Sequence, residues 1–165
     1  MSGQVRSSRA AYRAAGVDVE AGESFAIDVR MIDRPARLKL SVEEGARLVE
    51  ARLRVAVQSR QVTLHAQPVV RLDTGTVSGV EMLARWTDPE LGPVTPAEFI
   101  DVAEASSLIV ALGEQLLELA ISTAVQHRFH ERDLACAVNV SPVQLRVPGF
   151  ADDLLDRLRQ HRLPA

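Results

Sequence analysis

The spacing of apolar positions divides the chain into an unpatterned first part and a longer patterned part that starts near residue 41. Residues 1–40 hold a single short strand candidate, Ser24–Val29. From Ser41 onward, apolar residues recur at spacings of four and three, which predicts an amphipathic helix that ends near Arg60. We therefore expect two regions, an N-terminal linker over residues 1–40 and a folded domain over residues 41–165.

Alternating residues follow this helix and predict a β-hairpin. Residues 62–70 and 76–86 have the pattern of strands, and the turn residues Leu72-Asp73-Thr74-Gly75 join them. Thr95, Pro96 and Glu98 have the spacing of a capped helix start. The remaining pattern predicts a helix over 108–129, an apolar strand over 135–140 that is buried on both faces, and an amphipathic helix over 148–162.

Composition narrows the class of protein. The 165 residues suffice for one ordinary domain, and the apolar content of 47% is that of a globular chain. The net charge of −3 argues against a sequence-independent nucleic-acid binder, so we expect no DNA or RNA partner. The single cysteine, Cys136, lies in an apolar run and is expected to be buried in a protein of a reducing compartment. No apolar stretch approaches the roughly 20 residues of a membrane helix, and the N-terminus has no apolar h-region, which favours a cytoplasmic location without a membrane segment.

Polar side chains gather on one face of the predicted sheet. Because successive strand residues face opposite sides, Glu81, Leu83 and Arg85 share a face, with about 13 Å between the acid and the base at roughly 3.3 Å per residue. Gln67 on the first strand and Asn139 at the end of the third strand are at matching positions. Each polar residue alone is well explained as a solvated rim residue. Three strands that together deliver Glu, Gln and Asn favour a phosphoester site, in which the acid holds a metal and the base holds a phosphate.

Five short segments share the order and spacing of a known family. They are His65–Val70, Gly79–Trp86, Pro96–Ile100, Ala103–Glu104 and Val138–Leu145. Over roughly residues 45 to 165 the chain resembles the EAL domain family, which consists of bacterial cyclic di-GMP phosphodiesterases and their non-catalytic relatives. Residues 5–30 faintly resemble the end of a GGDEF domain, and an unrelated linker explains them as well.

The resemblance implies an α/β fold, an incomplete TIM-like (β/α) barrel of EAL type whose first strand is antiparallel to the others. It also implies two divalent metal ions, Mg²⁺ or Mn²⁺, that activate water to open the cyclic dinucleotide. Carried over by position, Glu81 and Asn139 are expected as metal ligands, and Gln67, Leu83 and Arg85 as contacts to cyclic di-GMP. A homodimer or other signalling domains are the partners that the family leaves open.

Two departures from the family pattern bear on activity. Met82 replaces the motif's alanine, but it lies on the opposite strand face from Glu81, so we expect repacking without loss of chemistry. The family's further metal-binding acids and its catalytic lysine correspond to sequence beyond residue 165, and a TIM barrel needs about 250 residues. We therefore expect a truncated phosphodiesterase domain that is inactive as an isolated chain. The alternative is a non-catalytic cyclic di-GMP receptor or a protein-interaction scaffold.

Overall fold

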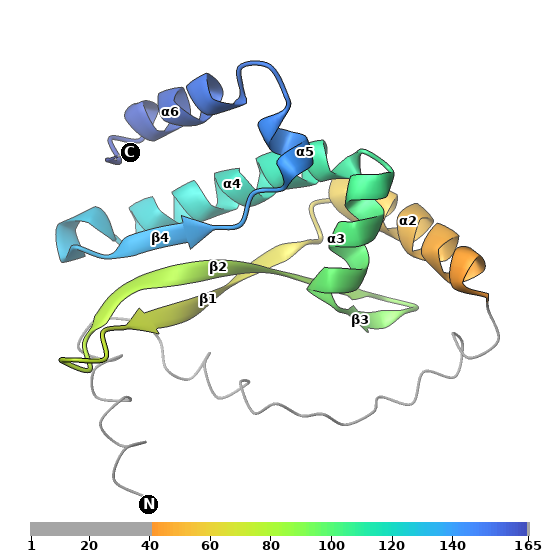
Figure 1. Cartoon of the computed structure of the whole chain (residues 1–165), viewed down its shortest axis with the longest axis horizontal. Coiled ribbons are helices and arrows are strands. Elements are labelled where there is room, and N and C mark those ends of the chain that lie inside the picture. The colour runs from red at the N-terminus through yellow and green to blue at the C-terminus, as the bar shows by residue number, and fades with distance from the viewer. Residues whose placement is uncertain (1–40, 165) are drawn as a thin grey trace, which may run out of the picture.

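A mixed four-stranded sheet lies at the centre of the computed structural model, which describes residues 41–164 (Figure 1). The elements follow in the order α2 (Val42–Gln58), β1 (Thr63–Val70), β2 (Val77–Asp88), β3 (Gly92–Val94), α3 (Pro96–Ala105), α4 (Leu108–Gln126), the 3-10 helix η2 (His130–Arg132), β4 (Ala135–Val138), α5 (Pro142–Leu145) and α6 (Phe150–Gln160). In Figure 1, α4 and β4 lie between the β1–β2 hairpin and α6.

The strand directions include the predicted antiparallel first strand. β1 pairs antiparallel with β2, and β4 pairs parallel with β2 on its other side. The short strand β3 pairs antiparallel with the end of β2. The parallel pair is connected through α3 and α4, as in a (β/α) unit. The prediction of a TIM-like α/β fold with an antiparallel first strand is therefore confirmed.

Among residues 41–164, the helices cover one face of β2 and not the other. Val80 and Met82 are almost fully buried and pack in one apolar cluster with residues of α4. Further along the same face, Trp86 meets Phe99 of α3 edge to face, with 5.9 Å between the ring centroids. Met82 thus points into the core, away from the polar face, as predicted.

An ion pair ties α2 to the end of β2. The α2 helix begins with the predicted capping box of Ser41 and Glu44. Arg52 Nε lies 2.9 Å from Asp88 Oδ2, and its Nη1 lies 2.8 Å from Glu90 Oε1. Burial by itself would raise the pKa of Asp88, but hydrogen bonds from Arg52 and from two backbone amides outweigh it and hold that pKa below its ordinary value.

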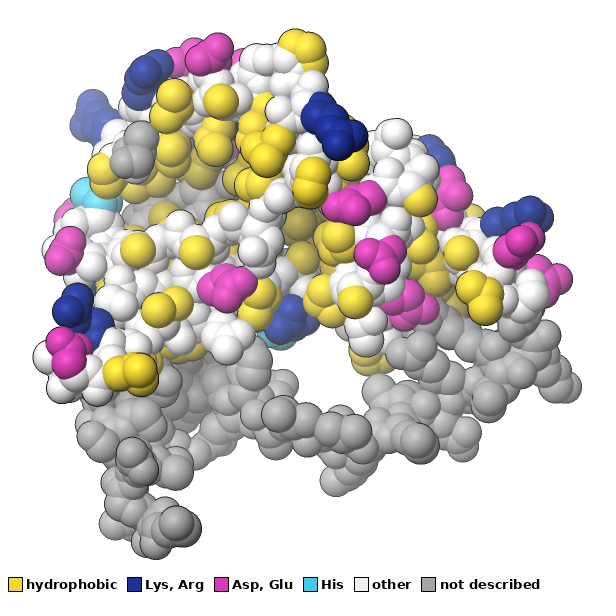
Figure 2. Space-filling view, in the orientation of Figure 1, with side chains coloured by type: hydrophobic (Ala, Val, Ile, Leu, Met, Phe, Trp, Pro, Cys, Tyr) yellow, Lys and Arg dark blue, Asp and Glu magenta, His cyan; other side chains and the backbone are white. Residues whose placement is uncertain are grey.

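The third predicted strand differs from expectation in its burial. Ala135, Cys136 and Ala137 of β4 are exposed, and the prediction that this strand is buried on both faces is wrong for the described residues. β4 pairs with β2 on one side, and among residues 41–164 no strand pairs with its other edge. Figure 2 shows apolar side chains gathered in this region, below α6. Partial desolvation still raises the pKa of the Cys136 thiol, although the residue is exposed and not buried as predicted.

Two helix predictions also need correction. Thr95 precedes α3 but makes no side-chain cap hydrogen bond; its backbone carbonyl accepts from Glu98 and Phe99 instead, at 3.1 Å each. The helix α4 is long and apolar enough to cross a membrane by length and composition alone, contrary to the expectation that no stretch approaches that length. In the structure, however, α4 packs as a core helix, with eight of its residues buried.

Some predictions concern the first forty residues. The strand candidate Ser24–Val29 and the GGDEF-like segment over residues 5–30 lie outside the described residues.

At the other end of the chain, Phe150, Leu154 and Leu158 of α6 are half-buried, and Arg157 forms an ion pair with Glu118 of α4 at 3.7 Å.

Candidate ligand and metal site

Glu81 and Asn139 meet on the face of the sheet that the described helices do not cover. Glu81 lies in the middle of β2, and Asn139 follows the last residue of β4. The side-chain amide of Asn139 donates from Nδ2 to Glu81 Oε1 at 2.8 Å. The parallel pairing of β2 with β4 produces this contact, because it places Ala137 directly beside Glu81. Two predicted metal ligands, 58 positions apart in sequence, are thus side by side.

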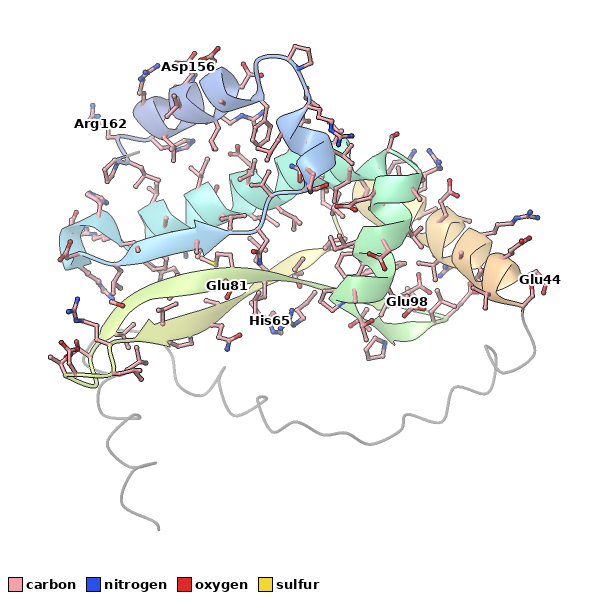
Figure 3. The ribbon with its side chains drawn as sticks, viewed as in Figure 1. Glu44, His65, Glu81, Glu98, Asp156 and Arg162 are labelled. Carbon is pink, nitrogen blue, oxygen red and sulfur yellow. The ribbon has the colours of Figure 1, made fainter. Side chains whose placement is uncertain are left out.

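Strand β1, which is antiparallel to β2, adds a second row of side chains to the same face. Gln67 is the direct partner of Glu81 in the antiparallel register, His65 is the partner of Leu83, and Thr63 is the partner of Arg85. Figure 3 shows Glu81 and His65 on this hairpin. All five predicted site residues therefore lie on one continuous face, from Asn139 across β2 to β1.

Arg85 marks the end of this face that is farther from Asn139. Arg85 is half-buried, and its Nη1 donates to the Ala84 carbonyl at 2.8 Å. A groove of about 420 Å³ opens beside it, lined by Gln61, Thr63, His65, Arg85, Trp86, Thr87, Pro93, Val94, Thr95 and Pro96. The guanidinium and the hydroxyl groups in this lining are donors that suit a phosphate. His65 and Thr63 lie on this face by the strand register, but they were not predicted to be site residues.

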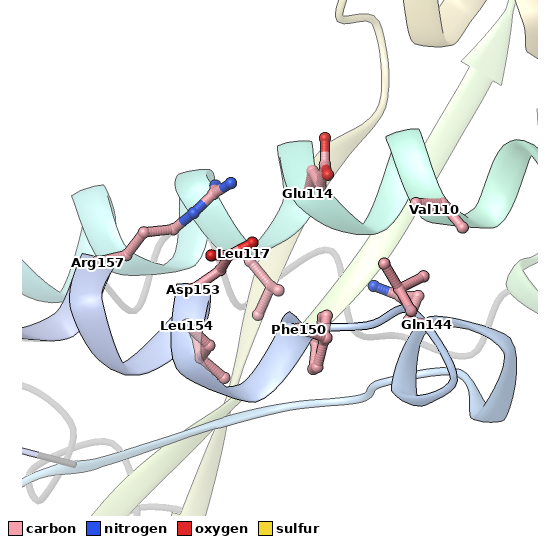
Figure 4. A pocket seen from close by; sticks show the side chains of 9 residues that line it. Val110, Glu114, Leu117, Gln144, Phe150, Asp153, Leu154 and Arg157 are labelled. Carbon is pink, nitrogen blue, oxygen red and sulfur yellow. The ribbon is translucent and has the colours of Figure 1, made fainter.

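A second, smaller hollow lies away from the polar face. It holds about 40 Å³ between α4, α5 and α6, and Figure 4 shows Phe150, Leu117 and Gln144 around it. None of the five predicted site residues lines it. We regard it as a packing gap between helices.

The residues near Glu81 fit one hard metal ion better than two. Within residues 41–164 no group of three or more His, Cys, Asp and Glu side chains is arranged to hold a metal. Glu81 supplies a carboxylate, and Asn139, whose Nδ2 donates to that carboxylate, also carries an amide oxygen. Mg²⁺ commonly binds one or two carboxylates and fills its remaining positions with water and substrate phosphate. A site with two bridged ions requires more carboxylates than residues 41–164 supply on this face.

Comparison with known sequences agrees with these features. Residues 50–165 match the family described as EAL domain. The chain is 38% identical over 115 residues to the bifunctional diguanylate cyclase/cyclic di-GMP phosphodiesterase MucR of Pseudomonas aeruginosa, covering 67% of this chain and 16% of that protein. It is 36% identical over 110 residues to the probable cyclic di-GMP phosphodiesterase PdeG of Escherichia coli, covering 63% of this chain and 21% of that protein.

Solved structures show the same similarity. The PaMucR phosphodiesterase in complex with c-di-GMP superposes with a TM-score of 0.65 at 36% identity, over 70% of this chain and 47% of that one. The FimX EAL domain from Pseudomonas aeruginosa bound to c-di-GMP gives a TM-score of 0.60 at 28% identity, over 70% of this chain and 46% of that one.

These matches define both the family and the extent of the similarity. The chain spans less than a quarter of the length of the two curated relatives and less than half of the two solved chains. The family match begins at residue 50 and gives no support to the GGDEF-like segment. From residue 50 onward, the chain belongs to the EAL domain family.

Proposed function

We propose that this chain forms the part of a cyclic di-GMP phosphodiesterase domain that binds the dinucleotide and contributes the first metal ligands. The observation that carries the proposal is the 2.8 Å contact between Asn139 Nδ2 and Glu81 Oε1, with Gln67 directly across the strand pair. The names of the relatives support the choice of ligand, since MucR and PdeG are described as cyclic di-GMP phosphodiesterases and two matching structures contain c-di-GMP.

Each side chain has a role that its chemistry suits. Glu81 and Asn139 would hold Mg²⁺ or Mn²⁺ through oxygen atoms, and the bound ion would supply an activated water and neutralise charge on the phosphate. Arg85 would bind a phosphate oxygen, which a guanidinium does with two parallel donors. Gln67 can both donate to and accept from a base or a sugar, and Leu83 between them offers apolar contact.

The proposed role of the 165 residues stops short of hydrolysis. Opening the ring requires water to attack phosphorus while an ester P–O bond breaks, a step in which two metal ions, if held by the protein, would stabilise the attacking and the leaving oxygen. One carboxylate and one amide supply too few ligand atoms for two ions. We infer that residues 41–165 form the ligand-binding domain, that residues 1–40 are a linker to it, and that this chain alone binds the dinucleotide without cleaving it.

Calorimetric titration with cyclic di-GMP in the presence of Mg²⁺ tests the proposal on the full chain. Arg85→Met is expected to weaken binding about 10- to 100-fold, because a charge-assisted hydrogen bond is lost. Glu81→Gln is expected to remove the dependence on Mg²⁺. The matched control is Arg54→Met, which changes an arginine paired with Glu50 on the exposed side of α2 and leaves binding unchanged.

Two results would contradict these statements. Equal affinity of the wild type and Arg85→Met would show that the polar face is not the binding site. Conversion of cyclic di-GMP to the linear dinucleotide by the wild type with Mn²⁺, lost in Glu81→Gln, would show that the chain is catalytic.

The scarcity of metal ligands supports a second candidate, a non-catalytic cyclic di-GMP receptor. Within residues 41–164 Glu81 has no partner group of acids around it that could hold two ions. A receptor of this kind binds the dinucleotide without a metal ion. Affinity that is the same with Mg²⁺ and with a chelator, and unchanged in Glu81→Gln, would favour the receptor.

A further inference from the structure

Asn139 lies in a segment whose backbone is no longer part of the sheet. Strand β4 ends at Val138, and α5 begins at Pro142. The Asn139 side chain is exposed, yet its amide lies 2.8 Å from Glu81. Two residues later, the Ser141 side chain is only 8% exposed. This contrast indicates that Asn139 is held in position by buried groups that follow it in the sequence.

We propose that Glu104, Ser141 and Gln144 form a latch that sets the position of Asn139 opposite Glu81, and that Gly113 makes room for this latch. These residues lie outside the candidate ligand site, so they are positioning residues. The consequence for dinucleotide and metal binding rests on the proposed function, but the position of Asn139 does not.

The first part of the latch is the Ser141 hydroxyl. Its Oγ donates to Glu104 Oε1 at 2.6 Å and accepts from the Val143 backbone amide at 3.1 Å. The hydroxyl has one proton, and the bond to Glu104 uses it, which fixes the side-chain direction. Because Glu104 belongs to α3, this bond joins the segment after β4 to a helix packed on the core.

The second part is Gln144, which is 3% exposed. Its Oε1 accepts from the Ser141 backbone amide at 3.1 Å, so the same serine is held through its side chain and its main chain. The other end of the Gln144 amide lies against Gly113 in the middle of α4. A methyl group added at Gly113 would overlap that amide.

Gly113 therefore has a packing role. Glycine inside a helix destabilises it relative to alanine by roughly 0.5–1 kcal/mol, so a reason for its presence is expected. Gly45 in α2 provides a contrast, because an added methyl group there would meet nothing within 4 Å. Gly113→Ala and Gly45→Ala thus make the same chemical change, and only the first displaces Gln144.

Displacement of the latch would reach Asn139 over a very short path. A chain advances at most about 3.6 Å per residue, so the two residue steps from Ser141 to Asn139 span about 7 Å or less. Val140 is the only residue between them. We therefore expect a displacement of Ser141 to move Asn139 and to lengthen the contact between Asn139 Nδ2 and Glu81 Oε1.

The sequence allows a direct test, because Asn139 is the only asparagine in the chain. Labelling of asparagine side-chain amides with ¹⁵N gives one pair of signals, whose exchange with water can be measured on the ligand-free chain. Ser141→Ala, Glu104→Ala and Gly113→Ala are expected to speed this exchange about fivefold, to the value in Glu81→Ala, because the bond to Glu81 is lost. Glu104→Gln retains an acceptor oxygen and is expected to restore slow exchange, as is the control Gly45→Ala.

Fluorescence of the single tryptophan, Trp86, reports in the same samples whether the core is intact. Unchanged exchange at Asn139 in both Ser141→Ala and Glu104→Ala, with unchanged Trp86 emission, would overturn the proposal. Loss of Trp86 burial in both variants would overturn it as well, since these residues would then support the fold as a whole.

Addition of cyclic di-GMP with Mg²⁺ separates this inference from the proposed function. If the latch variants speed exchange but the dinucleotide does not bind the wild type, the proposed function fails and the latch stands. If the dinucleotide binds the wild type and all latch variants with equal affinity, the latch has no bearing on the site and the proposed function stands.

Discussion

Asp88→Asn is expected to destabilise the domain by about 2 kcal/mol at neutral pH. Asp88 is 3% exposed, and its carboxylate accepts from Arg52 Nε and from the backbone amides of Glu90 and Leu91, each at 2.9 Å. Asparagine keeps an acceptor for the two amides but loses the charged bond to Arg52, which contributes roughly 1.5–3 kcal/mol. The Arg52 side chain is 28% exposed and can be hydrated in the variant, so we expect the loss of stability to lie below the upper end of this range.

The lowered pKa of Asp88 also predicts how the effect of Asp88→Asn on stability changes with pH. The pKa of Asp88 is lowered in the folded state, so its charge stabilises the fold above the ordinary aspartate pKa of about 3.9. That contribution is lost as the pH falls through the lowered folded-state pKa. The difference between the wild type and Asp88→Asn should therefore be full at pH 7 and shrink in strong acid.

Urea denaturation followed through the fluorescence of Trp86 measures both effects. Asp73→Asn is the matched control, because Asp73 lies in the exposed turn between β1 and β2, 3.4 Å from Arg71, and we expect it to change the free energy of unfolding by less than about 0.5 kcal/mol. A double-mutant cycle with Arg52→Met should recover most of the Asp88→Asn effect as coupling. An effect as small as that of Asp73→Asn, or one that is the same at pH 7 and pH 2, would refute the argument.

Two further predictions follow from backbone strain and from the free thiol. Arg60 follows α2 with a φ of +54°, so Arg60→Gly is expected to raise the free energy of unfolding by about 1 kcal/mol, whereas Arg54→Gly inside α2 should lower it by a similar amount. Urea denaturation compares the two, and a loss of stability in Arg60→Gly would contradict the reasoning. Cys136 is exposed with a raised pKa, so iodoacetamide should form one adduct, with a half-maximal rate at higher pH than for free cysteine. Complete resistance to the reagent, or a half-maximal rate at lower pH, would show that the surroundings of this thiol are different.

Local sequence patterns predicted which strand residues share the polar face, but they did not predict the contact that joins Asn139 to Glu81. Alternation along β1 and β2 placed Gln67, Glu81 and Arg85 on one side, and the register confirms that they share it. The contact of Asn139 with Glu81 joins positions 58 apart, and no local period encodes such a pairing. Strand alternation placed Asn139 only at a matching strand end, and the family resemblance added that Asn139 and Glu81 are both expected as metal ligands.

The errors have a common origin in surroundings that a strand or helix cannot specify alone. The apolar residues of β4 predicted burial on both faces, but such burial requires other elements packed on each face, and Ala135, Cys136 and Ala137 are exposed in the described part of the chain. The strand Gly92–Val94 and the helix Pro142–Leu145 are too short for any period to be recognised. The role of Gly113 was not predicted either, since it depends on the distant side chain of Gln144.

The two faces of β2 also bear on how such a domain can change over evolutionary time. Val80 and Met82 are 1% and 3% exposed and hold the core, while Glu81 between them points to the open side and supports no apolar cluster. The acid can therefore be exchanged without loss of the packing that keeps the strand in place. Selection on folding and selection on chemistry act on alternate residues of one strand. The domain can thus lose the proposed metal ligand in a single substitution and keep the packing that folds it.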